Sequence, residues 1–241
     1  MKILAIGNSY TEDSFTHLLK VLESQGKKDY HICFLYIGGS QIDLHYKNIL
    51  EDNNTYDLFD GKNGEYEKIN NYSIKDAMKL DDFDIITIQQ QSARSGQKDT
   101  FKNLDNLLDQ IDKLKKEDSK VLFIRTWAYP AFSTFEEFDW YDRDCQKMNE
   151  AIEKVIDTII RPNKRIEGIV PIGNVIYKAK EYFMDEDLYR DDLHLSYDEG
   201  RYIAACTIAR FFMKLDYAKL NLFPQIKKEV LETIIETAYT K

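Results

Sequence analysis

Cysteine is scarce in this sequence, and long apolar runs are missing. The three cysteines among 241 residues, Cys33, Cys145 and Cys206, are odd in number, widely spaced and without a Cys-x-x-Cys pair. This pattern predicts neither a disulfide framework nor a zinc site, so packing roles are expected for all three. The tightest apolar runs, such as residues 121–124, are far shorter than the roughly 18 residues that a membrane-spanning helix needs. We therefore interpret these runs as buried strands.

Positive charge is also in deficit. The chain has 33 Lys and Arg against 42 Asp and Glu, a formal net charge of −9. Nucleic acids are usually bound by clustered Lys and Arg, and no such cluster stands out. We expect a small-molecule ligand, with no nucleic acid and no membrane as partner. The apolar run at residues 3–6 is too short for the core of a signal peptide, which predicts a cytoplasmic location.

The order of apolar segments predicts an α/β fold. Short, nearly continuous apolar strands are expected at residues 2–6, 31–37, 83–89, 120–126 and 166–170. Helical spacing of apolar residues predicts helices at residues 14–23, 41–50, 74–80, 101–115, 141–160, 198–215 and 224–240. This alternation is typical of a three-layer α/β/α sandwich around a five-stranded parallel sheet. Residues 52–72, rich in Asn, Asp, Gly and Tyr, predict a surface loop or hairpin inserted into a single domain over residues 1–241.

Ligands of parallel sheets bind outside the carboxyl ends of the strands, so the residues after each strand are of interest. The first strand leads into Gly7-Asn8-Ser9, which places Ser9 on a sharp turn directly before a helix. Such a turn can present a hydroxyl and aim backbone N–H groups at a developing negative charge. A serine in this place is also typical of a helix cap.

A second motif, Asp191-Asp192-Leu193-His194, lies near the other end of the chain. A serine nucleophile needs a general base, usually histidine, and that histidine needs a carboxylate to orient it. Of the four histidines, His194 has this spacing to an aspartate, and the spacing favours Asp191 over Asp192. The two motifs together predict a Ser-His-Asp triad. No spacing of carboxylates and histidines indicates a metal, and no cofactor is expected.

With these motifs the sequence resembles the SGNH, or GDSL-type, hydrolase family. It is most similar to a poorly characterised bacterial branch in which the last block ends in His-Leu-Ser and is followed by Gly-Arg-Tyr. The resemblance implies an SGNH-type fold, with Ser9 as nucleophile, His194 as base and Asp191 as its orienting partner. The blocks that carry it are Gly7-Asn8-Ser9, Gly38-Gly39, Gln89-Gln90-Gln91-Ser92 and Asp191-Asp192-Leu193-His194.

The same resemblance implies an oxyanion hole. The N–H of Ser9 and that of Gly38 or Gly39 would be two donors, and Gly39 is preferred because it lies nearer the following helix. The parent family has Gly-x-Asn-Asp in its third block, with the asparagine amide as third donor. Matching by position puts Gln91 in that place. Gln89 remains a rival, and these glutamines also fit a polar loop without a role in the reaction.

Further residues are candidates for contact with a substrate. Trp127 and Tyr129 follow the fourth strand, where aromatic faces can stack on a sugar ring, although both also fit core packing. His45 follows the second block closely enough to reach the mouth of the site. The full set of substrate-binding candidates is Asn8, Gly38, His45, Gln89, Trp127 and Tyr129.

The expected function is that of a serine esterase, an SGNH-type ester hydrolase. The resemblance implies removal of a small acyl group, acetyl above all, and the aromatic residues point to an acylated carbohydrate as substrate. Two alternatives stay open: a flavodoxin-like protein that binds FMN, and a carbohydrate-binding protein without turnover. Glu12 and Asp13 argue against the flavin, because they place negative charge beside the loop that would hold its phosphate.

Overall fold

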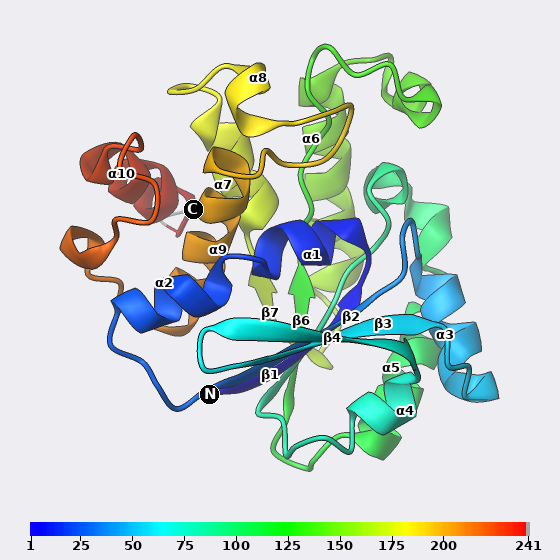
Figure 1. Ribbon diagram of the computed structural model, residues 1–241. Helices are drawn as coiled ribbons and strands as arrows, with labels where there is room; N and C mark the ends of the chain where they lie inside the picture. The colour runs from blue at the N-terminus through cyan, green and yellow to red at the C-terminus, as the bar shows by residue number, and fades with distance from the viewer. Residues whose placement is uncertain (240–241) are drawn as a thin grey trace.

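The computed structural model describes residues 1–239, and a seven-stranded sheet in the order β4-β3-β2-β1-β5-β6-β7 forms its centre (Figure 1). The strands are β1 (Lys2–Gly7), β2 (His31–Tyr36), β3 (Tyr56–Lys62), β4 (Glu65–Tyr72), β5 (Ile85–Ile88), β6 (Lys120–Ile124) and β7 (Ile166–Val170). Strands β2, β1, β5, β6 and β7 are parallel, which confirms the predicted five-stranded parallel sheet. Most of their residues are buried, because helices cover both faces.

The two additional strands come from the predicted insertion. Residues 52–72 form an antiparallel hairpin, and β3 pairs with β2 from Tyr36 opposite Asp57 to Ile32 opposite Gly61. The hairpin therefore extends the sheet by two strands. Strand β4 forms one edge of the sheet, and it carries several exposed polar and charged side chains, as edge strands commonly do.

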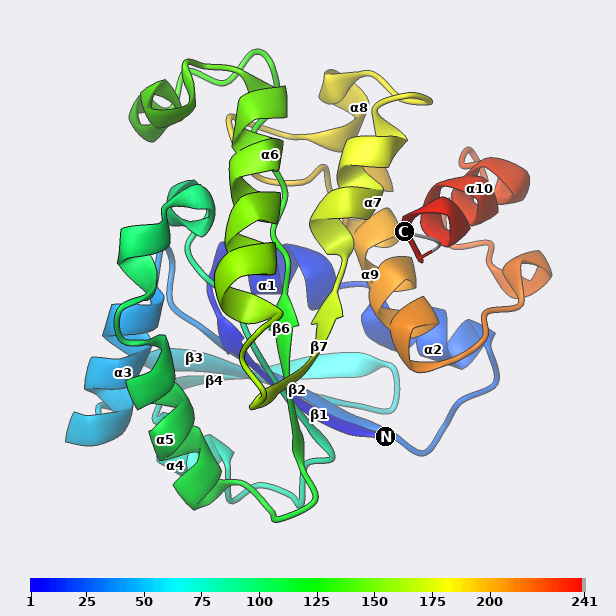
Figure 2. The same ribbon diagram turned by 180° about the vertical axis from the view of Figure 1, so that it is seen from behind.

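Helices lie on both faces of the sheet (Figures 1 and 2). One face is covered by α1 (Ser9–Phe15), α2 (Leu18–Ser24) and α9 (Glu199–Phe212), so the first helix lies beside one of the last. The opposite face has α3 (Ile42–Glu51), α4 (Ile74–Ala77), α5 (Leu104–Leu114) and α6 (Cys145–Val155). The remaining elements are α7 (Ile172–Ala179), α8 (Asp185–Leu188), α10 (Lys228–Tyr239), the π-helical η4 (Ile156–Ile160) and the 3₁₀ turns η1 (Ala93–Gly96), η2 (Lys98–Phe101), η3 (Glu136–Tyr141) and η5 (Tyr217–Lys219).

The first predicted helix, residues 14–23, is wrong in its boundaries. The chain forms two helices here, α1 from Ser9 and α2 from Leu18. Helix α1 begins early because the Asn8 side chain caps it, accepting a hydrogen bond from the Tyr10 N–H at 3.0 Å. Ser9 is thus the first helical residue, and its hydroxyl is not used as the cap.

The sequence analysis also missed α7 and α8, and it placed the last helix too early. Helix α10 begins at Lys228, and the predicted end of that helix at Thr240 lies outside the described residues. None of the helices in residues 1–239 combines the length and the apolar character needed to cross a membrane.

Candidate active site

The Asn8 side chain connects the loops that follow three of the parallel strands. Its Oδ1 accepts from the Tyr10 N–H and from the Gln89 amide at 2.7 Å, and its Nδ2 donates to the Ser40 carbonyl at 2.8 Å. These bonds link the loops after β1, β2 and β5. The following residue, Ser9, is therefore held at the amino end of α1, where backbone N–H groups have no partner within the helix.

Ser9, His194 and Asp191 form a continuous chain of hydrogen bonds. The Ser9 Oγ lies 2.8 Å from His194 Nε2. On the other side of the ring, His194 Nδ1 lies 3.0 and 2.9 Å from the two carboxylate oxygens of Asp191. A proton on Nδ1 that is donated to Asp191 leaves Nε2 as the acceptor for the serine hydroxyl. The arrangement can therefore remove a proton from Ser9.

The environment of Asp191 keeps this carboxyl ionised. Partial burial favours the neutral form, but the backbone N–H groups of His194 and Leu193 and the imidazole all favour the carboxylate. The backbone donors lie at 2.8 and 3.0 Å from Oδ1. Together they lower the pKa of Asp191 below its ordinary value of 3.8. The neighbouring Asp192 faces away and accepts from the Thr134 hydroxyl, so of the two aspartates Asp191 contacts the imidazole.

Asp13 of α1, which the sequence analysis did not select for this site, binds the segment of residues 189–195 that carries His194, here called the His194 loop. Its side chain is completely buried and accepts from the Leu195 N–H at 2.9 Å, from Arg190 at 2.8 Å and from Arg201 of α9 at 2.7 and 2.8 Å. The loop is closed on itself by a bridge between Tyr189 and Leu195. The helix that carries Ser9 therefore also holds the segment that carries His194.

Ser9 opens onto a cavity of about 190 Å³. Gly39 reaches it from the turn after β2, where its φ of +66° is a conformation that favours glycine. Gln91 reaches it from the loop after β5; its Oε1 accepts from the Arg94 N–H, and its Nε2 makes one long contact of 3.4 Å with Ser92. The residues around the cavity are Asn8, Ser9, Tyr10, Gly39, Gln91, Ser92, Phe135, Leu193 and His194.

Residues 2–238 match the model of a family described as a domain of unknown function, DUF4886. The chain belongs to the DUF4886 family. A comparison with curated protein sequences gives no match.

Solved structures place the DUF4886 chain among known folds. It is similar to a DUF4886 family protein from Bacteroides uniformis, with 27% identity, a TM-score of 0.89, and coverage of 100% of this chain and 95% of that chain. A member of the lipolytic protein G-D-S-L family from Veillonella parvula has 12% identity and a TM-score of 0.57, over 89% and 100% of the two chains. A catalytic mutant of an acetylxylan esterase from Geobacillus stearothermophilus has 10% identity and a TM-score of 0.55, over 87% and 92%. The DUF4886 chain thus shares its fold with GDSL-type proteins.

For three residues of this DUF4886 structure, the predicted contact with a substrate is wrong. His45, Trp127 and Tyr129 are completely buried, and none of them lines the cavity. His45 lies between the Tyr56 and Ser40 hydroxyls, at 2.8 and 3.3 Å, and burial lowers its pKa to about 4. An imidazole that is buried in this way cannot contact a substrate.

The two aromatic residues support the site from beneath. Trp127 stacks on Tyr10 with ring centroids 3.9 Å apart, and its Nε1 donates to the Leu193 carbonyl at 2.9 Å. The Tyr129 hydroxyl lies 2.8 Å from Ser92 Oγ. They face inward because the chain after β6 turns into the core. Of the other candidates, Gln89 is completely buried and Gly38 is exposed but does not line the cavity.

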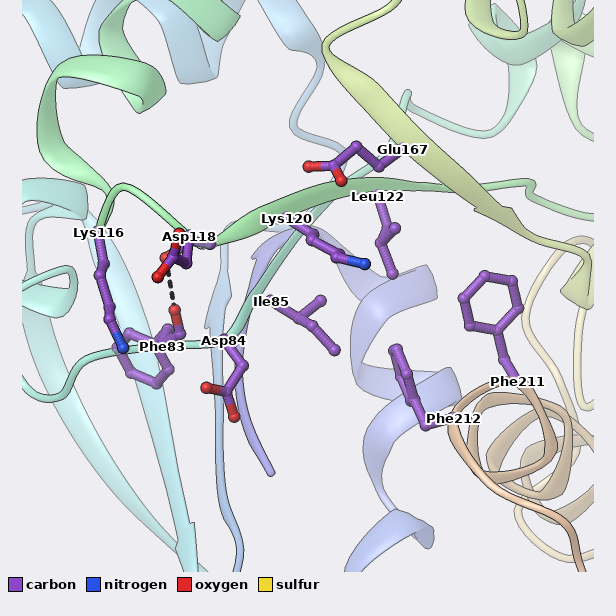
Figure 3. A pocket seen from close by; sticks show the side chains of 11 residues that line it. Phe83, Asp84, Ile85, Lys116, Asp118, Lys120, Leu122, Glu167, Phe211 and Phe212 are labelled. Carbon is purple, nitrogen blue, oxygen red and sulfur yellow. Dashed lines mark hydrogen bonds between the residues drawn. The ribbon is translucent and has the colours of Figure 1, made fainter.

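A larger cavity, of about 440 Å³, lies at the amino ends of β5 and β6, away from Ser9 (Figure 3). Phe211 and Phe212 face Ile85 there, below the charged side chains of Lys120 and Glu167. The Ser119 hydroxyl donates to the Phe83 carbonyl at 2.6 Å. No histidine lines this cavity, so it holds no pair of nucleophile and base like that of Ser9 and His194.

Proposed function

We propose that this DUF4886 protein is an SGNH-type serine esterase that removes a small acyl group through an acyl-enzyme. The hydrogen-bonded chain Ser9–His194–Asp191 at the mouth of a cavity carries this proposal. Structures of a lipolytic G-D-S-L protein and of an acetylxylan esterase with the same fold support it.

In the first half of the reaction, His194 Nε2 takes the Ser9 proton while Oγ attacks the ester carbonyl carbon. The negative charge that develops on the carbonyl oxygen is met by the N–H groups of Ser9 and Gly39 and by the Gln91 amide. His194 then gives its proton to the leaving alcohol. A water molecule, deprotonated by the same imidazole, attacks the acyl-enzyme carbonyl carbon and releases the acid and the free serine.

The size of the cavity favours a short acyl group. A volume of about 190 Å³ bounded by Phe135 and Leu193 is small for a ligand pocket, which favours a short acyl chain over a long one. An acylated carbohydrate is proposed as the source of that group because of the likeness to the acetylxylan esterase. Trp127 and Tyr129 are buried and therefore cannot stack on this carbohydrate.

Hydrolysis of p-nitrophenyl esters of increasing chain length tests the proposal. We expect the acetate to be the best substrate, and Ser9→Ala or His194→Ala to lower kcat by about 10⁴- to 10⁶-fold. Ser14→Ala is the matched control, because Ser14 is also on α1 but its hydroxyl donates to the Tyr10 carbonyl. A fluorophosphonate should label Ser9 stoichiometrically. If the fluorophosphonate does not label the protein and the wild type hydrolyses no ester above the uncatalysed rate, the protein is a binding protein without turnover and the proposal is rejected.

A further inference from the structure

A second cluster of reactive side chains lies at the amino end of β2, far from Ser9. His31 and Cys33 are two residues apart on this strand, so both side chains point to the same face of the sheet. Cys33 lies opposite Asp60 of β3 in the antiparallel register. The register thus brings three different donor atoms together, although Asp60 follows Cys33 by 27 positions. The sequence pattern alone had indicated no metal site.

The three donor atoms form a small triangle. His31 Nε2 lies 2.7 Å from Asp60 Oδ1 and 3.1 Å from Cys33 Sγ, and Sγ lies 3.5 Å from Asp60 Oδ1. All three atoms are within 4.8 Å of one another. His31 and Cys33 are buried, whereas the Asp60 side chain is 17% exposed and opens the cluster to solvent.

The surroundings of His31 resemble the support that metal-bound imidazoles have. Its other nitrogen, Nδ1, lies 2.7 Å from Asp81 Oδ2, and Asp81 is in turn paired with Lys2 at 2.7 Å. A carboxylate on the second nitrogen fixes the orientation of a ligating imidazole and raises its basicity. Lys62 lies 3.3 Å from Asp60 Oδ2, which leaves Oδ1 directed at the other two donors.

We propose that His31 Nε2, Cys33 Sγ and Asp60 Oδ1 bind a zinc ion. Imidazole, thiolate and carboxylate together are a donor set that suits Zn²⁺. The thiolate and the Asp60 carboxylate balance the two positive charges of the ion, while the charge of Asp81 is already matched by Lys2. Water from the exposed side of Asp60 supplies the fourth ligand.

The distances are compatible with an ion in place of a proton. Zinc bonds of about 2.0 to 2.3 Å separate tetrahedral donors by about 3.3 to 3.7 Å. The Sγ–Oδ1 and Sγ–Nε2 distances are near this range, and the Nε2–Oδ1 distance of 2.7 Å is that of a hydrogen bond. Binding replaces the proton of that hydrogen bond and the thiol proton, both of which pass to solvent. A small rotation of the partly exposed Asp60 side chain opens the triangle.

Such an ion would hold the inserted hairpin to the parallel sheet. Asp60 belongs to β3, His31 and Cys33 belong to β2, and Asp81 belongs to the loop before β5. The cluster lies at the amino ends of the parallel strands, whereas Ser9 lies at their carboxyl ends. We therefore expect zinc to raise stability and to leave ester hydrolysis unchanged, so this inference does not depend on the proposed function.

Cobalt is the probe for this site, because a thiolate bound to Co²⁺ gives a charge-transfer band in the near ultraviolet. Protein freed of metal with a chelator is titrated with Co²⁺, and one equivalent should produce the band, which Zn²⁺ then removes. Cys33→Ser should abolish the band, and the matched control Cys145→Ser, at the start of α6, should keep it. Zinc at about 100 times its Kd should raise Tm by about 5 to 10 °C.

Two results would overturn the inference. One is a folded wild-type protein with neither a cobalt band nor a zinc-dependent Tm, which would leave His31 as a hydrogen-bonded bridge between Asp60 and Asp81. The other is a band that survives Cys33→Ser. If Cys33→Ser does not fold, the nearly isosteric Asp60→Asn decides: a loss of affinity for Co²⁺ of tenfold or more supports the site, and an unchanged affinity rejects it.

Discussion

The carboxylate of Asp13 receives the backbone N–H of Leu195 and the guanidinium groups of Arg190 and Arg201, although it is completely buried. Replacing it by asparagine keeps the shape but removes the nearest negative partner of two arginines. We expect Asp13→Asn to lower the free energy of unfolding by about 3 to 5 kcal/mol, the cost of breaking a buried ion pair from one side. Urea denaturation measures this loss.

The control for Asp13 is an aspartate of a solvent-exposed pair. Asp139 contacts Arg143 at 2.6 Å, and its side chain is 62% exposed. Asp139→Asn should change stability by no more than about 1 kcal/mol. If the two variants were equally stable, Asp13 would not be the anchor of the His194 loop.

Gln91 is the proposed side-chain donor of the oxyanion hole. Gln91→Ala should lower kcat by about 10²- to 10³-fold with little change in KM, because the amide acts on charge that develops in the transition state. The measurement is steady-state hydrolysis of p-nitrophenyl acetate, with the exposed Gln146 changed to alanine as control. Full activity of Gln91→Ala would leave the oxyanion to the backbone donors alone.

The sequence indicated the proposed catalytic residues but not the residues that hold them in place. Ser9, Asp191 and His194 stand in short motifs whose spacing has a chemical reason, and the structure brings them together. Asp13 could not be recognised, since its contact with Leu195 spans 182 positions. Trp127 was misinterpreted because an aromatic residue after a strand has the same pattern whether it faces a ligand or the core.

At the scale of elements, strands were easier to predict than helices. Continuous apolar runs mark strands buried on both faces, and β1 and β2 end within one residue of the boundaries that the sequence predicts. Helix α7 was missed because Gly173 and Asn174 follow Pro171, a combination typical of turns. The break between α1 and α2 was missed because leucines continue the helical spacing across it.

The same Gly173 allows α7 to lie close to the chain that follows β6. A Cβ atom there would lie 1.9 Å from the Thr126 carbonyl oxygen, which is backbone and cannot rotate away. Gly173→Ala should therefore lower the free energy of unfolding by about 1 to 3 kcal/mol or more, as overpacking does. Gly168→Ala is the control measured beside it in urea: its Cβ would contact the movable Leu122 and Phe211 side chains, and we expect a smaller loss.

The stability of the whole molecule should depend on pH through His45. Its pKa of about 4 lies below the 6.5 of an exposed imidazole. As the pH falls below 6.5 the unfolded chain binds a proton that the folded chain does not bind until about pH 4. The stabilisation is therefore complete above pH 6.5 and is lost progressively toward pH 4, by about 2 kcal/mol at pH 5.

Urea denaturation at pH 7 and pH 5 measures this dependence, with His45→Gln as the comparison. The variant is expected to be less stable at pH 7, because the Tyr56 and Ser40 hydroxyls lose their partner. Its further loss between pH 7 and pH 5 should be smaller than that of the wild type by about 2 kcal/mol. Equal losses in the two proteins would show that His45 is not the titrating group.

The position of Ser9 and His194 in the chain has a consequence for biosynthesis. The two residues are 185 positions apart, so the ribosome adds His194 to the chain 185 residues after Ser9. Until then the serine has no imidazole beside it and is an ordinary alcohol. Incomplete chains, whether nascent or cut short by a nonsense codon, should thus be unreactive toward esters in the cell.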